Sequence, residues 1–252
     1  LIDKLFSPIT NKLFKLPGIA SIPIILGIFS GYPIGAKIVK ELYEKKLLSK
    51  NNANTLLAFT NNSGPLFIVS FIGISLYHDT KTGILLLITH IISAFIVGII
   101  ISFFTKEDKS INKTSNQENI ENSKNKNIAN IIVDSIKDSV STCLFIGGFI
   151  IFFSVIICLL TNSLFFDILS KPINYILNIF NISTIQTIPF LQGIIEMTNG
   201  INIISTLNSI PYIYKISLTA FILGIGGVSI YMQLLAIISN TDLLLAIILF
   251  VL

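Results

Sequence analysis

Charged side chains are scarce in this chain of 252 residues, and arginine is missing altogether. Only 12% of the residues are charged, against about 25% in an average soluble domain, while 52% are hydrophobic and the mean hydropathy is +0.83. A soluble protein of this size could not cover so much apolar surface, whereas a bilayer would solvate it. The composition therefore excludes an ordinary soluble fold and predicts an integral membrane protein.

The other scarcities narrow the function. A net charge of +4, spread over several loops, is too dilute to bind nucleic acid but can orient a membrane protein. Cys143 and Cys158 lie in one apolar run and match no zinc-ligand spacing, so we interpret them as thiols facing lipid or the core. The sequence has no phosphate-binding loop, nucleophile elbow or metal-binding histidine pair. We therefore expect no enzyme activity, no cofactor, no metal and no nucleic-acid partner.

Two apolar segments are long enough to cross a bilayer, which takes about 20 apolar residues. They are 83–104 and 139–161. Four other apolar segments contain glycine, proline or polar residues in their middle, namely 18–36, 51–77, 187–206 and 211–238. Backbone interruptions at membrane depth are tolerated where they line protein or a wet cavity. The sequence thus predicts an all-α integral membrane protein with broken or re-entrant helices.

A polar stretch, 105–127, divides the chain into two membrane parts. It is rich in Asn, Lys and Glu, as is typical of a solvated linker. The parts 1–104 and 128–252 each hold interrupted segments in the same order, and such pairs indicate a transporter site. We expect two inverted repeats, the second cut short in the half-span of residues 243–252. Because the chain begins at Leu1, not Met, we expect it to be part of a longer protein.

The charges around segment 18–36 indicate a re-entrant hairpin. The residues before it carry three lysines against one aspartate, and residues 37–50 carry five lysines against two glutamates. Both flanks favour the cytoplasm, which a hairpin satisfies and a full span does not. Segment 187–206 would then enter the membrane from the other face. Residues 163–181 mix apolar and polar positions around Pro172 and are predicted to form an interfacial helix.

The first interruption could hold an anion. Pro33 can open a new helix, and the free N–H groups of its first turn would attract negative charge. Lys37 follows about one turn later. The alternative is that Gly27, Gly31 and Gly35 form a stripe of small residues for helix packing.

The second interruption, residues 61–65, reads Asn-Asn-Ser-Gly-Pro. Unsatisfied polar groups in hydrocarbon are costly, which favours a functional reason for so many polar positions. Asn62 or Ser63 could cap a half-helix that starts near Pro65. The alternative is a simple kink whose polar groups are satisfied by neighbouring helices.

In the second half, Glu196 lies deep in an apolar segment, and a carboxylate there is a functional-site hypothesis by default. It could bind a coupling proton or cation, or pair with Lys215 or with helix ends. The glycines at 224–227 lack the spacing of a dinucleotide-binding motif and fit a half-helix turn or tight packing. His90 could relay protons or form a packing hydrogen bond.

We therefore predict one substrate-binding site built from the interrupted segments of both halves. Its candidate residues are Ser30, Gly31, Tyr32, Pro33, Gly35, Lys37, Asn61, Asn62, Ser63, Gly64, Glu196, Thr198, Asn199, Gly200, Gly226, Gly227, Ser229 and Gln233.

At these motifs the chain resembles a known family. SGYPIGAKIVKELYEKKLLS at 30–49, followed by LLAFTNNSGPLFIVSFIG at 56–73, resembles the YlbJ family of sporulation integral membrane proteins, within the wider nucleoside-recognition (Gate) superfamily. GIIEMTNG at 193–200 and AFILGIGGVSIYMQLLAIIS at 220–239 resemble the second-half motifs of the same proteins. The similarity covers the chain from about residue 15 onward.

The resemblance implies a spore-forming bacterium and transport of dipicolinate, a small dianion, toward the forespore. The superfamily also implies two alternatives, a carrier of nucleosides and a carrier of cations. A scaffold needed for spore development, without transport, is a third. We expect a protein of the bacterial cell membrane, in sporulating cells the outer forespore membrane, with lipid, the solute and a coupling proton or cation as partners. A homo-oligomer is left open.

Overall fold

The computed structural model describes residues 2–105 and 128–243, and every regular element in these ranges is a helix. In chain order the elements are α1 (Ile2–Phe14), the 3-10 helix η1 (Gly18–Ala20), α2 (Ser21–Ser30), α3 (Ile34–Glu44), α4 (Lys50–Phe59), the π-helix η2 (Leu66–Leu76), α5 (Thr80–Phe104), α7 (Ile128–Thr161), α8 (Phe165–Ile179), α9 (Thr187–Ile195), α10 (Met197–Thr206), α11 (Tyr212–Ile225) and α12 (Gly227–Ile238).

Within the described ranges, three stretches of helix are long and apolar enough to cross a membrane. They are α5, α7 and the consecutive pair α11 and α12, Tyr212–Ile238. A pair bent by 93°, Phe6–Phe14 with Gly18–Ser30, would make a fourth. The spans predicted at 83–104 and 139–161 are confirmed by α5 and α7, and the chain is an all-helical integral membrane protein.

Segments 18–36 and 187–206 each fold back on themselves. A Cβ added to Gly27 would lie 3.4 Å from the Cα of Gly35, although eight residues of continuous helix would separate the two by about 12 Å. Likewise, a Cβ added to Gly200 would collide with the backbone of Gly193. Helices α2 and α3 therefore form hairpin 1, and α9 and α10 form hairpin 2. The face from which each hairpin enters the membrane stays a prediction.

Each hairpin is followed by a broken helix. Helix α4 ends at Phe59, and η2 begins at Leu66 after an irregular stretch. Helix α11 ends at Ile225, and α12 begins at Gly227. The breaks therefore fall where the sequence analysis placed them, except that hairpin 2 turns at Glu196, with Gly200 inside α10.

The two halves are interlocked through their broken helices. Ile68 of η2, from the first half, is fully buried in a core cluster with Met197 and Ile201 of hairpin 2. In turn, Ile238 of α12, from the second half, is fully buried in a cluster with Leu56 of α4. Each half thus supplies a helix to the other half's core, which places the breaks near the middle of the molecule.

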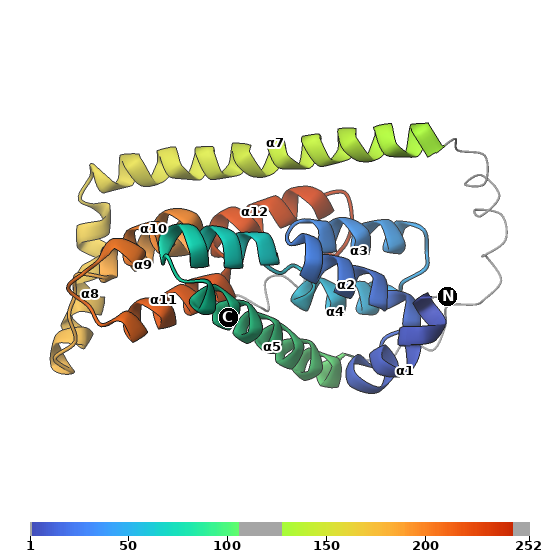
Figure 1. Ribbon diagram of the computed structural model, residues 1–252, viewed down its shortest axis with the longest axis horizontal. Helices are drawn as coiled ribbons and strands as arrows, with labels where there is room; N and C mark the ends of the chain where they lie inside the picture. The colour runs from blue at the N-terminus through green and yellow to red at the C-terminus, as the bar shows by residue number, and fades with distance from the viewer. Residues whose placement is uncertain (1, 106–127, 244–252) are drawn as a thin grey trace.

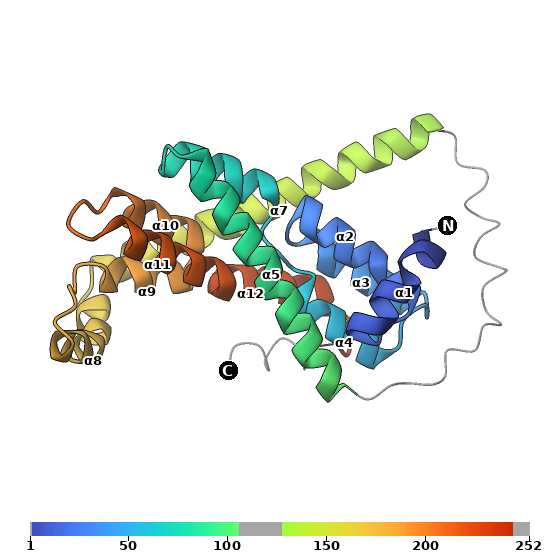
Figure 2. The same cartoon turned by 60° about the horizontal axis from the view of Figure 1, so that its bottom comes forward.

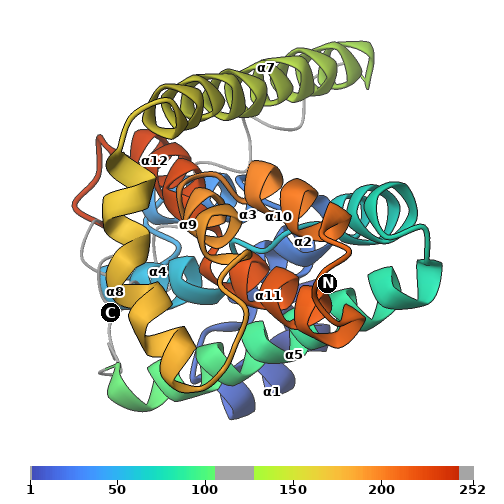
Figure 3. The same cartoon turned by 90° about the vertical axis from the view of Figure 1, so that its left-hand side faces the viewer.

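Figure 1 shows the arrangement, with hairpin 1 and α4 at one end of the long axis, hairpin 2 and α11 toward the other, and α7 running along the length of both. Helix α5 crosses obliquely beneath them, and the turned view in Figure 2 shows it passing between the two ends. The end-on view in Figure 3 shows α7 at the edge of the bundle, joined to it through α8.

Helices α5 and α7 expose most of their apolar surface, as helices that face lipid do. In each of them only 11% of the most apolar 18-residue stretch is buried. Three hydroxyl groups on α7 are satisfied within the helix, because Ser135, Ser139 and Thr142 each donate to the carbonyl four residues earlier. Helix α8 confirms a helix around Pro172. Its interfacial position stays a prediction, and the linker at 106–127 and the run 244–252 lie outside the described residues.

Candidate functional site

The tip of hairpin 1 is bonded to the break between α4 and η2. The backbone N–H of Tyr32 donates to the carbonyl oxygen of Asn62 over 2.6 Å. Gly31 has φ +79°, and a Cβ there would lie 2.8 Å from the backbone nitrogen of Gly64. Glycine is needed at Gly31 for both reasons, the left-handed conformation and the close approach of a second backbone.

The break at residues 60–64 is held by side chains as well. The amide nitrogen of Asn62 donates to the Phe59 carbonyl over 2.8 Å and so satisfies an acceptor at the end of α4. The backbone N–H of Ser63 donates to Nε2 of His90 on α5 over 3.1 Å. The side-chain oxygen of Asn61 is buried and has no hydrogen-bond partner within the described part of the chain.

Hairpin 2 turns at Glu196, which is 3% exposed and has extended backbone angles. Its carboxylate caps α10 by accepting from the backbone N–H groups of Thr198 at 3.1 Å and Asn199 at 2.9 Å. The structure thus shows the helix-end contact considered for Glu196, while Lys215 donates to the carbonyl of Ser205. Hairpin 2 is attached to α7 because the Asn199 amide donates to Ser154 over 2.7 Å.

The break between α11 and α12 faces the end of hairpin 2. Gly226 and Gly227 have φ +81° and +78°, and a Cβ on Gly227 would lie 3.2 Å from the carbonyl oxygen of Gly193. The first turn of α12 therefore meets the last carbonyls of α9. Ser229 and Gln233 are each 1% exposed, and the Gln233 amide donates to the Ser229 hydroxyl over 3.4 Å.

A cavity of about 220 Å³ opens where the two halves meet. We call it the central cavity. Its polar lining consists of Tyr32, Asn61, Asn62, Ser63, His90, Ser93 and Tyr231, and residues 224–226 also line it. Asp, Glu and Lys do not occur among its lining residues in the described ranges. Glu196 lies near enough to interact electrostatically with Tyr32. The cavity can therefore bind a small polar molecule through hydrogen bonds and aromatic contacts.

Tyr32, Asn61, Asn62, Ser63 and Gly226 of the predicted site line this cavity. Most other candidates form the surrounding breaks and hairpins without lining it. These residues are Ser30, Gly31, Pro33 and Gly35 in hairpin 1, Gly64 beside its tip, Glu196, Thr198, Asn199 and Gly200 in hairpin 2, and Gly227, Ser229 and Gln233 in α12.

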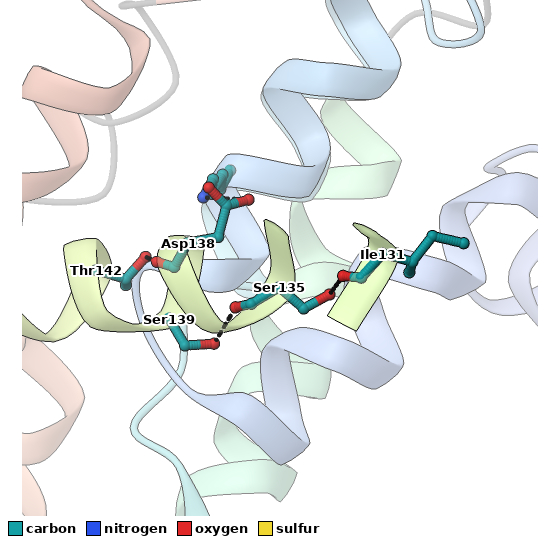
Figure 4. Close-up of polar contacts among 6 residues, drawn as sticks. Ile131, Ser135, Asp138, Ser139 and Thr142 are labelled. Atoms are coloured by element: carbon teal, nitrogen blue, oxygen red, sulfur yellow. Dashed lines mark hydrogen bonds and ion pairs between the residues drawn. The ribbon is translucent and has the colours of Figure 1, made fainter. Parts of the chain in front are cut away.

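Lys37 lies elsewhere, on the outer side of hairpin 1. Its ammonium group is 3.6 Å from Asp138 of α7, an aspartate that lies in the run of hydroxyl side chains drawn in Figure 4. Lys37 lines a separate hollow of about 510 Å³ between α3, α7 and α12. The structure therefore does not bring Lys37 together with the polar groups of the central cavity.

Sequence reasoning missed Ser93 and Tyr231, and it did not connect His90 with the breaks. A signal was available for Ser93, because it follows His90 by three residues and so shares its helix face. No local pattern indicates that α5 crosses the break at Ser63. That proximity depends on the packing of η2 against α5, where Gly73 approaches Gly83.

A polar contact outside the cavity also links the two halves. Asp242, just after α12, accepts from the Tyr43 hydroxyl and the Lys50 ammonium group, each over 2.7 Å. Lys40 donates to the carbonyl of Ile237 near the end of α12 over 2.8 Å. We call the group Lys40, Tyr43, Lys50 and Asp242 the polar latch. It ties α3 and the start of α4 to the end of α12.

Comparison with known proteins identifies a relative among the sporulation proteins. The sporulation integral membrane protein YlbJ of Bacillus subtilis strain 168 is 31% identical to this chain over 255 aligned residues, which cover 96% of the chain. The chain spans 62% of that relative's length. No family model matches the chain, and no solved structure matches it.

Proposed function

Since the chain belongs to the YlbJ family of sporulation integral membrane proteins, we propose that it carries a small anionic solute, dipicolinate, across a membrane of the sporulating cell. We propose that this membrane is the outer forespore membrane. We expect lipid and the solute as partners, and we expect no catalysis.

The observation that carries this proposal is the position of the central cavity, where breaks from both halves meet. Backbone that leaves helical geometry at membrane depth requires an environment that satisfies its polar groups. In transporters such interrupted helices from two repeats surround the substrate. This arrangement favours transport over a scaffold without transport, because a scaffold needs no cavity where two broken helices meet.

The lining supports a small solute with a flat ring. At about 220 Å³ the cavity is smaller than typical ligand sites of roughly 300–1,000 Å³. Tyr32 and Tyr231 offer aromatic faces, and the amide of Asn61 offers hydrogen bonds. Because η2 begins just after Ser63, its amino-terminal end adds partial positive charge near the cavity. The same aromatic and amide lining also suits a nucleoside, which is the second candidate.

We further propose that the two halves are inverted repeats that move by alternating access. Each half has a hairpin followed by a broken helix, and each hairpin packs against the break of its own half, as Tyr32 does on Asn62 and Ile195 on Gly227. Movement of one such unit relative to the other would open the cavity to one side at a time.

Uptake of labelled dipicolinate into vesicles containing the purified protein tests the proposal. We expect saturable uptake that Asn61→Ala weakens. The matched control is Asn54→Ala, because the side-chain oxygen of Asn54 is likewise buried without a partner among the residues that the structure describes, but it does not line the cavity. Unlabelled dipicolinate should compete better than a nucleoside. Absence of saturable uptake would overturn transport of dipicolinate, and stronger competition by the nucleoside would favour the second candidate.

A further inference from the structure

His90 connects the central cavity to the break between α4 and η2. It lies on α5, lines the cavity, and accepts a hydrogen bond at Nε2 from the backbone N–H of Ser63. The same break is also bonded to the tip of hairpin 1, because the carbonyl of Asn62 accepts from the backbone N–H of Tyr32. A change at His90 therefore acts on both the cavity wall and the contact between hairpin 1 and the broken helix.

The chemistry of this hydrogen bond fixes the state of the ring. A backbone N–H can only donate, so Nε2 must be unprotonated, and the proton of the neutral imidazole is on Nδ1. If a proton from bulk water binds Nε2, the ring becomes a cation and both ring nitrogens become donors. Two donors then face each other at Ser63, and the hydrogen bond between the break and α5 is lost.

The other groups that line the cavity determine how protonation of His90 changes the charge offered to a solute. The titratable groups of the surrounding elements that line the cavity are Tyr32 from hairpin 1 and Tyr231 from α12, and Glu196 of hairpin 2 interacts electrostatically with Tyr32. Asn61 and Ser63 line the cavity from the break, and Ser93 lines it from the same helix as His90. Since lysine does not line the cavity in the described ranges, an imidazolium at His90 would be the cationic group offered to an anionic solute there.

We propose that His90 is the positioning residue that couples proton binding to the movement of the broken helix α4–η2. Neutral His90 keeps the break bonded to α5 by accepting the hydrogen bond from the Ser63 N–H. An anionic solute in the cavity favours protonated His90, which pairs with the solute and releases the break. By linkage, a proton then favours binding of the anion as much as the anion favours binding of the proton. This inference rests on the proposed function for its solute, but its structural step can be tested without the solute.

The first test is dipicolinate binding at different pH values, with proton uptake recorded in weakly buffered solution. We expect affinity to rise as the pH falls, by up to roughly tenfold per pH unit, the limit for one linked proton. His90→Gln keeps a side-chain acceptor for the Ser63 N–H but cannot titrate, so its affinity should not depend on pH and binding should take up no proton. His78→Gln is the matched control, because His78 is exposed and outside the cavity. A pH dependence that persists in His90→Gln overturns the proposal.

The second test needs no solute and so separates failure of this inference from failure of the proposed function. Ala94 lines the cavity one turn after His90. In a background with Cys143→Ser and Cys158→Ser, we expect Ala94→Cys to be labelled by N-ethylmaleimide at a rate that depends on His90. We divide the labelling rate of the protein with His90 by that of the His90→Gln protein at each pH. This ratio removes the pH dependence of the thiol itself. We expect this ratio to rise as the pH falls, and a constant ratio overturns the proposal.

A third measurement leaves His90 unchanged, in case His90→Gln does not fold. The chain has two histidines, so His78→Gln leaves His90 alone. Nitrogen-15 NMR of that histidine should show an unprotonated Nε2 and a protonated Nδ1 at neutral pH. Both nitrogens should be protonated at low pH or after addition of dipicolinate. A proton on Nε2 at neutral pH without solute would overturn the proposal.

Discussion

The backbone N–H of Tyr32 bonds to the carbonyl of Asn62, thirty residues later, and so joins two interruptions into one structure. Neither interruption could stand alone in hydrocarbon, because each unsatisfied backbone group there costs several kcal/mol. Together they satisfy some of each other's hydrogen-bonding groups, while Asn61 lines the central cavity and its side-chain oxygen has no partner among the described residues. The break in the helix and the binding cavity are therefore parts of the same arrangement.

The close packing of hairpin 1 on the break can be tested at its glycines. A Cβ at Gly27 or Gly35 would collide with the carbonyl oxygen of Thr60, which is backbone and cannot turn away. We expect Gly35→Ala to destabilise the protein by at least about 1–3 kcal/mol, the usual cost of overpacking. Thermal unfolding of the purified protein in detergent measures it. In the control Gly147→Ala, no described residue beyond the adjoining backbone of the same helix has an atom within 4 Å of the new methyl group, and equal destabilisation there would contradict the prediction.

Much of this fold can be predicted from the sequence, because a helix in hydrocarbon must be apolar and its backbone must stay hydrogen-bonded. The uninterrupted apolar runs at 83–104 and 139–161 predict α5 and α7, and polar residues inside other runs predict the breaks. Glu196 illustrates the limit of such reasoning. Its depth in an apolar segment indicates importance, but its role as the cap of α10 depends on backbone geometry that the pattern does not specify.

Lys37 and His90 show why the site was only partly predictable. Lys37 is close in sequence to the hairpin 1 tip, yet helical rotation carries it to the outer side, where it meets Asp138. His90 is 27 residues from Ser63 and reaches it through the packing of η2 on α5. Distance along the chain predicts neither result, because both depend on how helices from different segments cross.

Capping by Glu196 predicts an ordered series of variants. Glu196→Ala removes the acceptor for two N–H groups at the start of α10 and should cost about 0.5–2 kcal/mol of stability. Glu196→Gln keeps one side-chain oxygen as acceptor, so it should cost less. Chemical or thermal unfolding of the three proteins gives the order. If Glu196→Gln is as unstable as Glu196→Ala, the charge rather than the cap stabilises hairpin 2.

The position of Lys37 predicts that its charge is not needed for binding of the solute. Its side chain is 47% exposed and that of Asp138 is 75% exposed, and such surface ion pairs contribute about 0–1 kcal/mol. We expect Lys37→Gln to keep the dipicolinate affinity of the unmodified protein, whereas Asn61→Ala weakens it. A double-mutant cycle with Asp138→Asn should give a coupling energy no larger than this range. Loss of solute binding in Lys37→Gln alone would place the lysine in the binding site after all.

The polar latch predicts a defined pH dependence of stability. The hydrogen bond from Lys50, followed by that from Tyr43, lowers the pKa of Asp242 below its ordinary 3.8, and the bond to Asp242 raises the pKa of Tyr43 above its ordinary 10.0. The stabilisation by Asp242 is therefore complete above about pH 4 and is lost as the pH falls through its lower folded value. The stabilisation by Tyr43 is complete below about pH 10 and is lost as the pH rises through its higher folded value.

We expect the latch to stabilise the contact between α3 and the end of α12 throughout the range between these limits. The difference in thermal midpoint between the unmodified protein and Asp242→Asn should stay constant from about pH 5 to 9 and shrink on the acid side, because protonated Asp242 no longer attracts Lys50. Tyr43→Phe should reduce the loss on the alkaline side. Asp167→Asn on α8, an exposed aspartate far from the latch in sequence, is the control. If the midpoint difference for Asp242→Asn matches that of Asp167→Asn at every pH, the latch does not hold the two halves together.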